Sequence, residues 1–162
     1  DGLRDLGCCP SPFDSYLMTL GLETLSLRVR HEVEAARRLA EYCRNHPKVE
    51  RVSFVGFESH PSYANAKKYF RFGSSAVFTI ELKGTLDSTV RFVESLNLAA
   101  HMVMIGDSVT VVTHPASTTH KQLSDADLAA AGVTPTMLRI SVGLENTDDL
   151  IDDFEQAFAH IG

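Results

Sequence analysis

The sequence predicts a two-layer α/β fold, in which a small, four-stranded and largely antiparallel sheet is covered by helices and preceded by a long linking helix. Segments with strand-like alternation follow segments with helical spacing along most of the chain. The length of 162 residues suits one domain with its own core. The hydrophobic content of 44% is ordinary for a globular protein.

The first predicted element is the long helix. Ser11 can cap its start and Pro12 suits its first turn. Apolar residues then recur at steps of three and four, at Leu22, Leu25, Val29, Val33, Ala36, Ala40 and Cys43. The pattern stops before Pro47, and Gly21 is the expected position of a bend.

A helix of this length often connects two domains. We therefore expect residues 1–30 to be a linking region that continues from another domain, and residues 31–162 to form a small domain. The chain also begins without an initiator Met, as expected of an internal cut or a trimmed chain.

The remaining elements follow from apolar periodicity and from turn residues. β-rich runs predict strands at 49–56, 76–82, 109–113 and 138–142. Helical spacing predicts helices at 59–70, 85–96, 124–132 and 147–161. Thr85 is the expected cap of the second of these helices. Residues 98–106 are equally compatible with an apolar loop and with a short strand.

Charge and composition restrict the partners and the location. The net charge of −6 gives no support to a nucleic-acid or anionic-membrane partner. No apolar run approaches the roughly 20 residues that span a bilayer, and the first residues lack the apolar segment of a signal peptide. Three cysteines do not make a disulfide framework. These features predict a protein of the reducing cytoplasm without a nucleic-acid or membrane partner.

Arg139 is the candidate binding residue in the last predicted strand. Leu138, Ile140 and Val142 share one face of that strand and should pack beneath helices, so Arg139 points to the opposite side. Its planar guanidinium can bind a carboxylate through two hydrogen bonds. The alternative is a surface arginine paired with a nearby acid, and spacing alone favours this commoner role.

The loop from His114 to His120 holds two histidines and three hydroxyls. A metal site would need a third ligand at suitable spacing, so no metal is expected, and a turn whose hydroxyls satisfy backbone groups is favoured. The sequence has no Gly-x-Ser-x-Gly elbow. Its lysines all occur in polar or turn settings, unlike a Schiff-base lysine, at Lys48, Lys67, Lys68, Lys83 and Lys121.

Several motifs together carry a resemblance to a known family. They occur in order along the chain as Ser11-Pro12-Phe13-Asp14-Ser15, His46-Pro47-Lys48-Val49, Ser59-His60-Pro61, Gly106-Asp107, His114-Pro115-Ala116-Ser117-Thr118-Thr119-His120 and Leu138-Arg139-Ile140-Ser141-Val142-Gly143-Leu144-Glu145. The chain resembles the C-terminal portion of the pyridoxal-phosphate (PLP)-dependent Cys/Met metabolism enzymes, and it is most similar to their O-acetylhomoserine sulfhydrylase (O-acetylhomoserine aminocarboxypropyltransferase) branch. The resemblance covers essentially the whole chain.

The resemblance implies the C-terminal domain of a fold-type I PLP transferase and reverses the preference at Arg139. The matching arginine binds the α-carboxylate of the amino-acid substrate, and the loop matching Met104-Ile105-Gly106 lies against that carboxylate. Relatives carry Ser or Asn at the position of Met104, so only a backbone contact is implied there. Thr119 matches a hydroxyl that supports the pocket wall.

The resemblance also implies that the Schiff-base lysine and the residues that hold PLP lie in a preceding large domain. The intact protein would make homocysteine and acetate from O-acetylhomoserine and sulfide, and would be a homo-oligomer, expected to be a tetramer. The chain alone would be inactive and would not bind the cofactor. A cystathionine γ-synthase or a methionine γ-lyase parent is the alternative within the family. A stand-alone small-molecule-binding regulatory α/β module is the alternative from another class.

Overall fold

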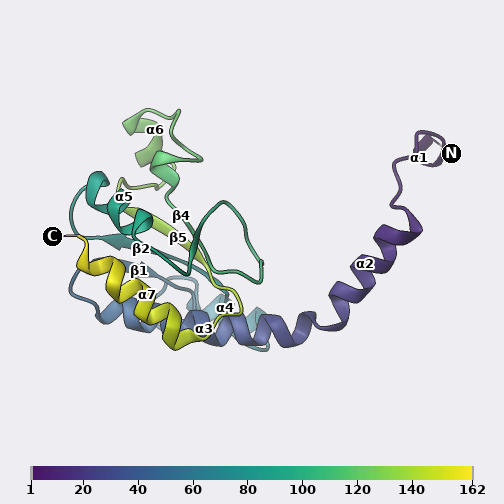
Figure 1. Ribbon diagram of the computed structural model, residues 1–162, viewed down its shortest axis with the longest axis horizontal. Helices are drawn as coiled ribbons and strands as arrows, with labels where there is room; N and C mark the ends of the chain where they lie inside the picture. Colours follow the sequence, from purple (N-terminus) through teal and green to yellow (C-terminus); the bar gives the residue numbers. More distant parts are fainter. Residues whose placement is uncertain (1, 162) are drawn as a thin grey trace.

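A computed structural model describes residues 2–161 of the chain, apart from the side chains of Leu3, Arg4 and Asp125. Asp1 and Gly162, at the outer ends of the two predicted domain ranges, lie outside the described residues. One sheet is covered on one face by helices, and a helical arm extends away from this body (Figure 1). No helix in the described part of the chain is both long and apolar enough to cross a membrane.

The sheet has five strands in the order β1-β2-β5-β4-β3. The strands are β1 (Val49–Ser53), β2 (Val77–Leu82), β3 (Ala100–His101), β4 (Val111–Thr113) and β5 (Met137–Ser141). All neighbours pair antiparallel except β3 and β4, which are parallel. The prediction of four strands is therefore wrong, because a strand of only two residues shows no alternation in the sequence.

The covered face of the sheet carries the apolar core. Leu138 and Ile140 of β5 are fully buried, as their alternation with Arg139 predicts. Three helices supply the opposing layer: α3 (Leu25–Asn45), α5 (Leu86–Glu94) and α7 (Thr147–Ala159). Phe92 of α5 packs edge-on against Phe154 of α7, with ring centroids 5.5 Å apart. The two-layer α/β architecture is confirmed.

The long first helix is interrupted. α2 (Pro12–Glu23) ends and α3 begins on either side of Thr24, whose φ of −107° and ψ of 0° leave the helical region. Gly21, the predicted bend, stays helical, and its carbonyl accepts a hydrogen bond of 2.5 Å from Arg28 Nη2. Ser11 caps α2 as predicted, in a reciprocal pair with Asp14.

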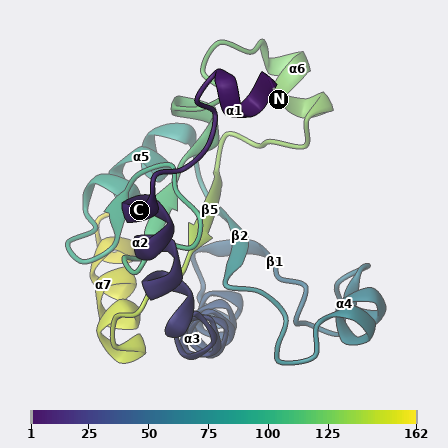
Figure 2. The same ribbon diagram turned by 90° about the vertical axis from the view of Figure 1, so that its right-hand side faces the viewer.

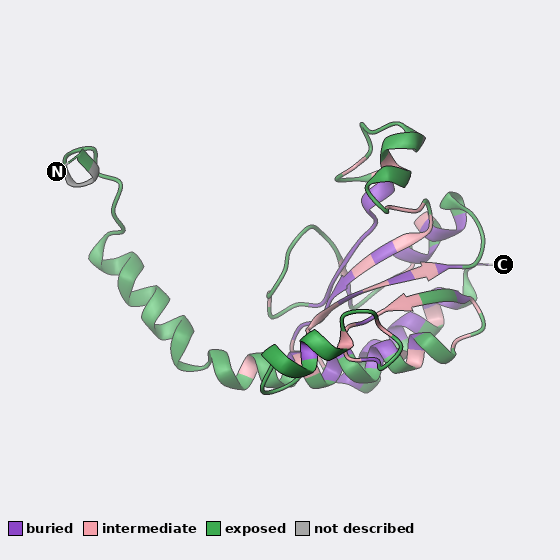
Figure 3. Cartoon of the chain, turned by 180° about the vertical axis from the view of Figure 1, so that it is seen from behind, coloured by how far each residue is buried: buried purple, intermediate pink, exposed green. Residues whose placement is uncertain are grey.

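No residue of α2 is buried, and Figure 3 shows this helix as exposed along its length. Its exposed residues include Phe13, Leu17, Met18, Leu20 and Leu22. The apolar positions that predicted this helix are exposed in α2. In α3 they form a packed face, where Ala36, Leu39 and Ala40 are fully buried. An apolar face left open to this extent is typical of a contact surface.

The smaller elements lie outside the sheet. α1 (Gly2–Asp5) forms the outer end of the arm (Figure 1). The others are α4 (Tyr63–Tyr69), the 3₁₀ turn η1 (Pro115–Ser117) and α6 (Asp125–Ala130). α4 lies on the β1 side of the molecule (Figure 2). Thr85 caps α5 as predicted, because its side chain accepts a hydrogen bond from the backbone N–H of Ser88.

Candidate functional site

Arg139 lies in the middle of β5, between Thr79 of β2 and Thr113 of β4. Its Nη2 donates to the carbonyl of Met104 at 3.4 Å and to Thr113 Oγ1 at 3.3 Å, both long contacts. Its Nε is buried and has no hydrogen-bond partner among the described residues. Within the described residues no carboxylate forms an ion pair with Arg139. The alternative, a surface arginine paired with a nearby acid, therefore has no support there.

The loop over Arg139 comes from residues 102–106, far from β5 in sequence. Thr113 Oγ1 donates to the carbonyl of Met102 at 2.6 Å. The backbone N–H of Gly106 donates to Ser141 Oγ at 3.3 Å. The carbonyl of Met104 accepts the hydrogen bond from Arg139, and the residue remains 47% exposed. The structure therefore brings Arg139 together with the loop containing Met104, Ile105 and Gly106.

Thr119 lies apart from this contact. It is exposed, and its hydroxyl is 2.8 Å from Nδ1 of His120. The neighbouring Thr118 donates to the carbonyl of His114 at 2.7 Å. Hydroxyls of this loop thus satisfy local groups, as the turn interpretation predicts. The supporting role of Thr119 stays a prediction.

His114 is the buried anchor of the same loop. Its Nε2 is 2.9 Å from the carbonyl of Pro135 and must donate to it, so Nδ1 accepts from Ser117 Oγ at 2.8 Å. Burial lowers the pKa of His114 below its ordinary value, although the hydrogen bond to Pro135 opposes the change. Both ring nitrogens of His114 are thus engaged within the loop, an arrangement that suits the neutral imidazole.

The lowered pKa of His114 predicts a stability that depends on pH. As pH falls below about 7.5, the unfolded chain takes up a proton near pH 6.5, whereas folded His114 resists protonation, so the folded state loses stability. Above about pH 7.5, His114 makes its full contribution to the stability of the folded state. The slope for one proton is at most about 1.4 kcal/mol per pH unit. Urea unfolding at pH 7.5 and 5.5 should show a smaller loss for His114→Gln than for the wild type, and equal losses would contradict the assignment.

A second network, which sequence reasoning missed, joins residues 143–145, which follow β5, to Thr110, which precedes β4. Glu145 accepts from both the backbone N–H and the hydroxyl of Thr110, at 2.6 and 2.7 Å. Thr110 Oγ1 accepts in turn from the backbone N–H of Gly143 at 2.9 Å. The order Gly143-Leu144-Glu145 was visible as a motif, but the sequence carried no signal that Thr110 is its partner.

Gly143→Ala is expected to destabilise the fold by about 1–3 kcal/mol, the usual cost of overpacking. A Cβ at Gly143 would lie 2.5 Å from the carbonyl oxygen of Ser108 and 2.6 Å from the carbonyl carbon of Val109, so backbone would have to move. Gly21→Ala is the matched control, because nothing lies within 4 Å of a Cβ there. Chemical denaturation should show a loss of stability for Gly143→Ala and no loss for Gly21→Ala.

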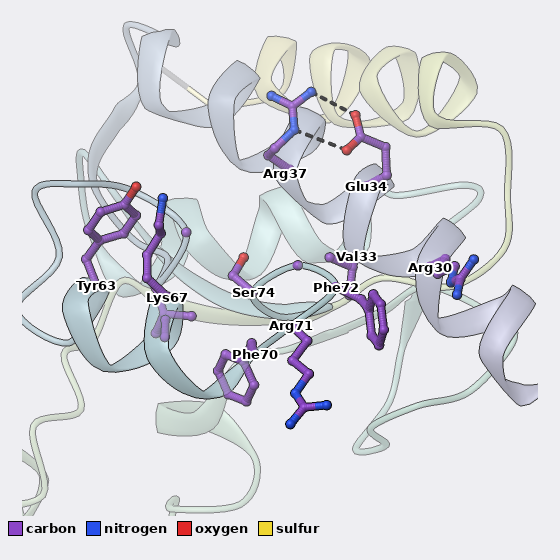
Figure 4. A pocket seen from close by; sticks show the side chains of 14 residues that line it. Arg30, Val33, Glu34, Arg37, Tyr63, Lys67, Phe70, Arg71, Phe72 and Ser74 are labelled. Carbon is purple, nitrogen blue, oxygen red and sulfur yellow. Dashed lines mark hydrogen bonds and ion pairs between the residues drawn. The ribbon is translucent and has the colours of Figure 1, made fainter.

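A groove lies elsewhere, between α3, α4 and residues 70–74 (Figure 4). Its volume is about 460 Å³. Arg37 holds the carboxylate of Glu34 at its edge through bonds of 2.7 and 3.2 Å. Further cations and aromatic rings line it, among them Arg30, Lys67, Arg71, Tyr63, Phe70 and Phe72. None of the predicted site residues belongs to this groove.

The model of one protein family matches residues 3–159, almost the whole chain, and its description is "Cys/Met metabolism PLP-dependent enzyme". The chain belongs to this family. The resemblance stated from the motifs is confirmed.

Individual relatives agree with this family. The chain is 44% identical to O-acetyl-L-homoserine sulfhydrylase 1 of Thermus thermophilus, over 98% of this chain and 38% of that protein. It is 46% identical to the homocysteine synthase of Schizosaccharomyces pombe, over 96% of this chain and 36% of the relative. The chain thus spans little more than a third of the length of these relatives.

A solved relative has the same fold. It is a putative O-acetylhomoserine (thiol)-lyase from Campylobacter jejuni that carries a pyridoxyl-lysine phosphate. The TM-score is 0.88 at 37% identity, and the match covers 97% of this chain and 37% of that one.

The family is PLP-dependent, but the residues described here do not by themselves fit the cofactor. Lys48 donates to the carbonyls of Phe158, at 2.8 Å, and of Ile161, so it belongs to the packing of the last helix. Lys67 and Lys68 lie over tyrosine rings of α4, and Lys83 and Lys121 are exposed. Lys48, Lys67 and Lys68 are therefore engaged by groups other than those that contact Arg139.

Proposed function

We propose that this chain acts within a longer PLP-dependent enzyme that makes homocysteine from O-acetylhomoserine and sulfide, and that it supplies the site for the substrate carboxylate. The observation that carries the proposal is the guanidinium of Arg139, which has no carboxylate partner among the described residues and lies against the loop of residues 102–106. The names of the relatives support the choice of substrate.

In this proposal Arg139 binds the α-carboxylate through two charge-assisted hydrogen bonds. Met104, Ile105 and Gly106 border the carboxylate through their backbone, and Met104 takes this role because its carbonyl already contacts Arg139. Thr119 supports the wall of the site from the neighbouring turn. PLP, held by the remainder of the longer protein, supplies the electron sink of the reaction.

The division of the chain belongs to the same proposal. Residues 1–30 would link to the large domain that binds PLP, and residues 31–162 would form the small domain. Support comes from the exposed apolar side chains of α2, which suit burial against further protein in a homo-oligomer. A cytoplasmic location is supported by three free cysteines, Cys8, Cys9 and Cys43.

Assays of the longer protein with purified substrates test the proposed reaction. We expect homocysteine and acetate from O-acetylhomoserine and sulfide. Formation of cystathionine when cysteine replaces sulfide would favour a cystathionine γ-synthase, and release of methanethiol from methionine would favour a methionine γ-lyase. Either result with no turnover of sulfide would overturn the sulfhydrylase proposal, while leaving the carboxylate site of Arg139 intact.

The isolated chain of 162 residues provides a second test. Mixed with PLP, it is expected to show no stable visible absorbance of covalently bound cofactor, because Lys48, Lys67 and Lys68 are engaged by other groups and Lys83 and Lys121 are exposed rather than held in a pocket. A stable absorbance band of bound PLP would contradict the proposal that the remainder of the longer protein holds the cofactor.

A further inference from the structure

Thr113 is the last residue of β4 and lies directly opposite Arg139 in the strand register. It is 1% exposed, and its hydroxyl makes two contacts. The first is donated to the carbonyl of Met102 at 2.6 Å. The second is accepted from Arg139 Nη2 at 3.3 Å. Because a hydroxyl carries one proton, its donation to Met102 leaves a lone pair for Arg139.

We propose that Thr113 is a positioning residue that holds the guanidinium of Arg139 and the loop of residues 102–106 in one arrangement before substrate arrives. The inference rests on the proposed function, since it concerns the carboxylate site described above. It adds a residue that neither the motifs nor the comparisons assign to that site.

Besides Thr113, few groups are in contact with Arg139 that could hold its guanidinium in place. Its Nε has no partner, and its remaining contact among the described residues is the carbonyl of Met104 at 3.4 Å. That carbonyl belongs to the loop that Thr113 itself anchors at Met102. Removing the hydroxyl therefore loosens the arginine directly and the loop as well. A long side chain that must be ordered on binding lowers affinity, so the hydroxyl should act mainly on substrate binding.

Thr79 offers a matched control. It flanks Arg139 on the other side, in β2, at the corresponding position of the register. No hydrogen bond joins its hydroxyl to Arg139 in the described part of the chain. Thr113→Val and Thr79→Val thus make the same chemical change on the two strands beside Arg139, and only the first removes a contact to it. Thr113→Ser keeps the hydroxyl and should behave as the wild type.

Steady-state kinetics of the longer enzyme tests the proposal. Thr113→Val should raise KM for O-acetylhomoserine about tenfold, the usual effect of one hydrogen bond, with kcat changed less than twofold. Thr113→Ser and Thr79→Val should stay within about twofold of the wild type. In an Arg139→Met background Thr113→Val should have no further effect, because the arginine through which it acts is gone. An equal effect in both backgrounds would overturn the proposal. Thr113→Ala is a second variant without the hydroxyl, if valine does not fold.

Hydrogen exchange on the chain itself gives a readout that does not depend on activity. Thr113→Val should increase exchange of the Gly106 amide, which donates to Ser141 across the same loop, while Thr113→Ser leaves it unchanged. Unchanged exchange in Thr113→Val would also overturn the proposal. If the wild-type enzyme does not turn over O-acetylhomoserine, the proposed function fails, whereas the exchange result still decides whether Thr113 holds the loop.

Discussion

Arg139→Met in the longer enzyme is expected to lower kcat/KM for O-acetylhomoserine by about 100-fold or more. Two charge-assisted hydrogen bonds to the substrate carboxylate would be lost, each with a contribution of about 1.5–3 kcal/mol, and 1.4 kcal/mol corresponds to a factor of ten. Methionine keeps much of the length of the side chain and removes its charge. The folded state should tolerate the change, since the hydrogen bonds of Arg139 to the other described residues are two long ones.

Arg51→Met is the matched control for this result. Arg51 is also a strand arginine, in β1, but it bonds to Glu81 and its side chain is 62% exposed. The same substitution there should leave kcat/KM within about threefold of the wild type. Comparable losses for Arg51→Met and Arg139→Met would mean that strand arginines act through folding and not through the substrate. Thermal unfolding of both variants separates these explanations.

Asp153→Ala is expected to destabilise the chain by about 3 kcal/mol or more. Asp153 is a buried carboxylate of α7 that accepts hydrogen bonds from three consecutive backbone N–H groups, those of Asn97 at 2.8 Å and of Leu98 and Ala99 at 3.0 Å. Gln156 Nε2 adds a fourth at 3.1 Å. Alanine would leave these donors without their acceptor, and an unpaired buried group costs about 1–3 kcal/mol.

Asp152→Ala is the control, because Asp152 is the preceding residue of the same helix and is exposed. Its removal should change the free energy of unfolding by less than about 0.5 kcal/mol. Urea denaturation of the two variants measures the difference. A loss below 1 kcal/mol for Asp153→Ala would show that water replaces the carboxylate. The prediction matters for the site because residues 97–99 lead directly into β3 and the loop over Arg139.

Elements of the fold that depend on residues close together in the sequence could be predicted, and elements that depend on distant residues could not. Capping pairs such as Ser11 with Asp14 are local, and they placed the start of α2 correctly. The end of α2 at Thr24 was not visible, because Thr24 is an ordinary residue inside a continuous apolar pattern. β3 was missed for a similar reason, since two residues are held as a strand only by their pairing with β4.

The same contrast between local patterns and long-range contacts applies to the candidate site. Alternation along β5 alone predicted that Arg139 lies opposite the core, and the motifs identified the family. The resemblance placed the loop containing Met104 beside Arg139, but no pattern in the residues indicated Thr113. Thr113 is 26 positions away from Arg139 and meets it only when β4 pairs with β5.

By itself, then, the sequence determined the fold class, the helix caps, the face of Arg139 and the family, because each depends on residues close together or on a motif read in order. The tertiary structure decided which groups meet across the sheet. It placed Thr113 against Arg139, Thr110 against Glu145 and Asp153 against residues 97–99. These contacts depend on strand order and on helix docking, and both arise from burial of the whole core and not from any local pattern.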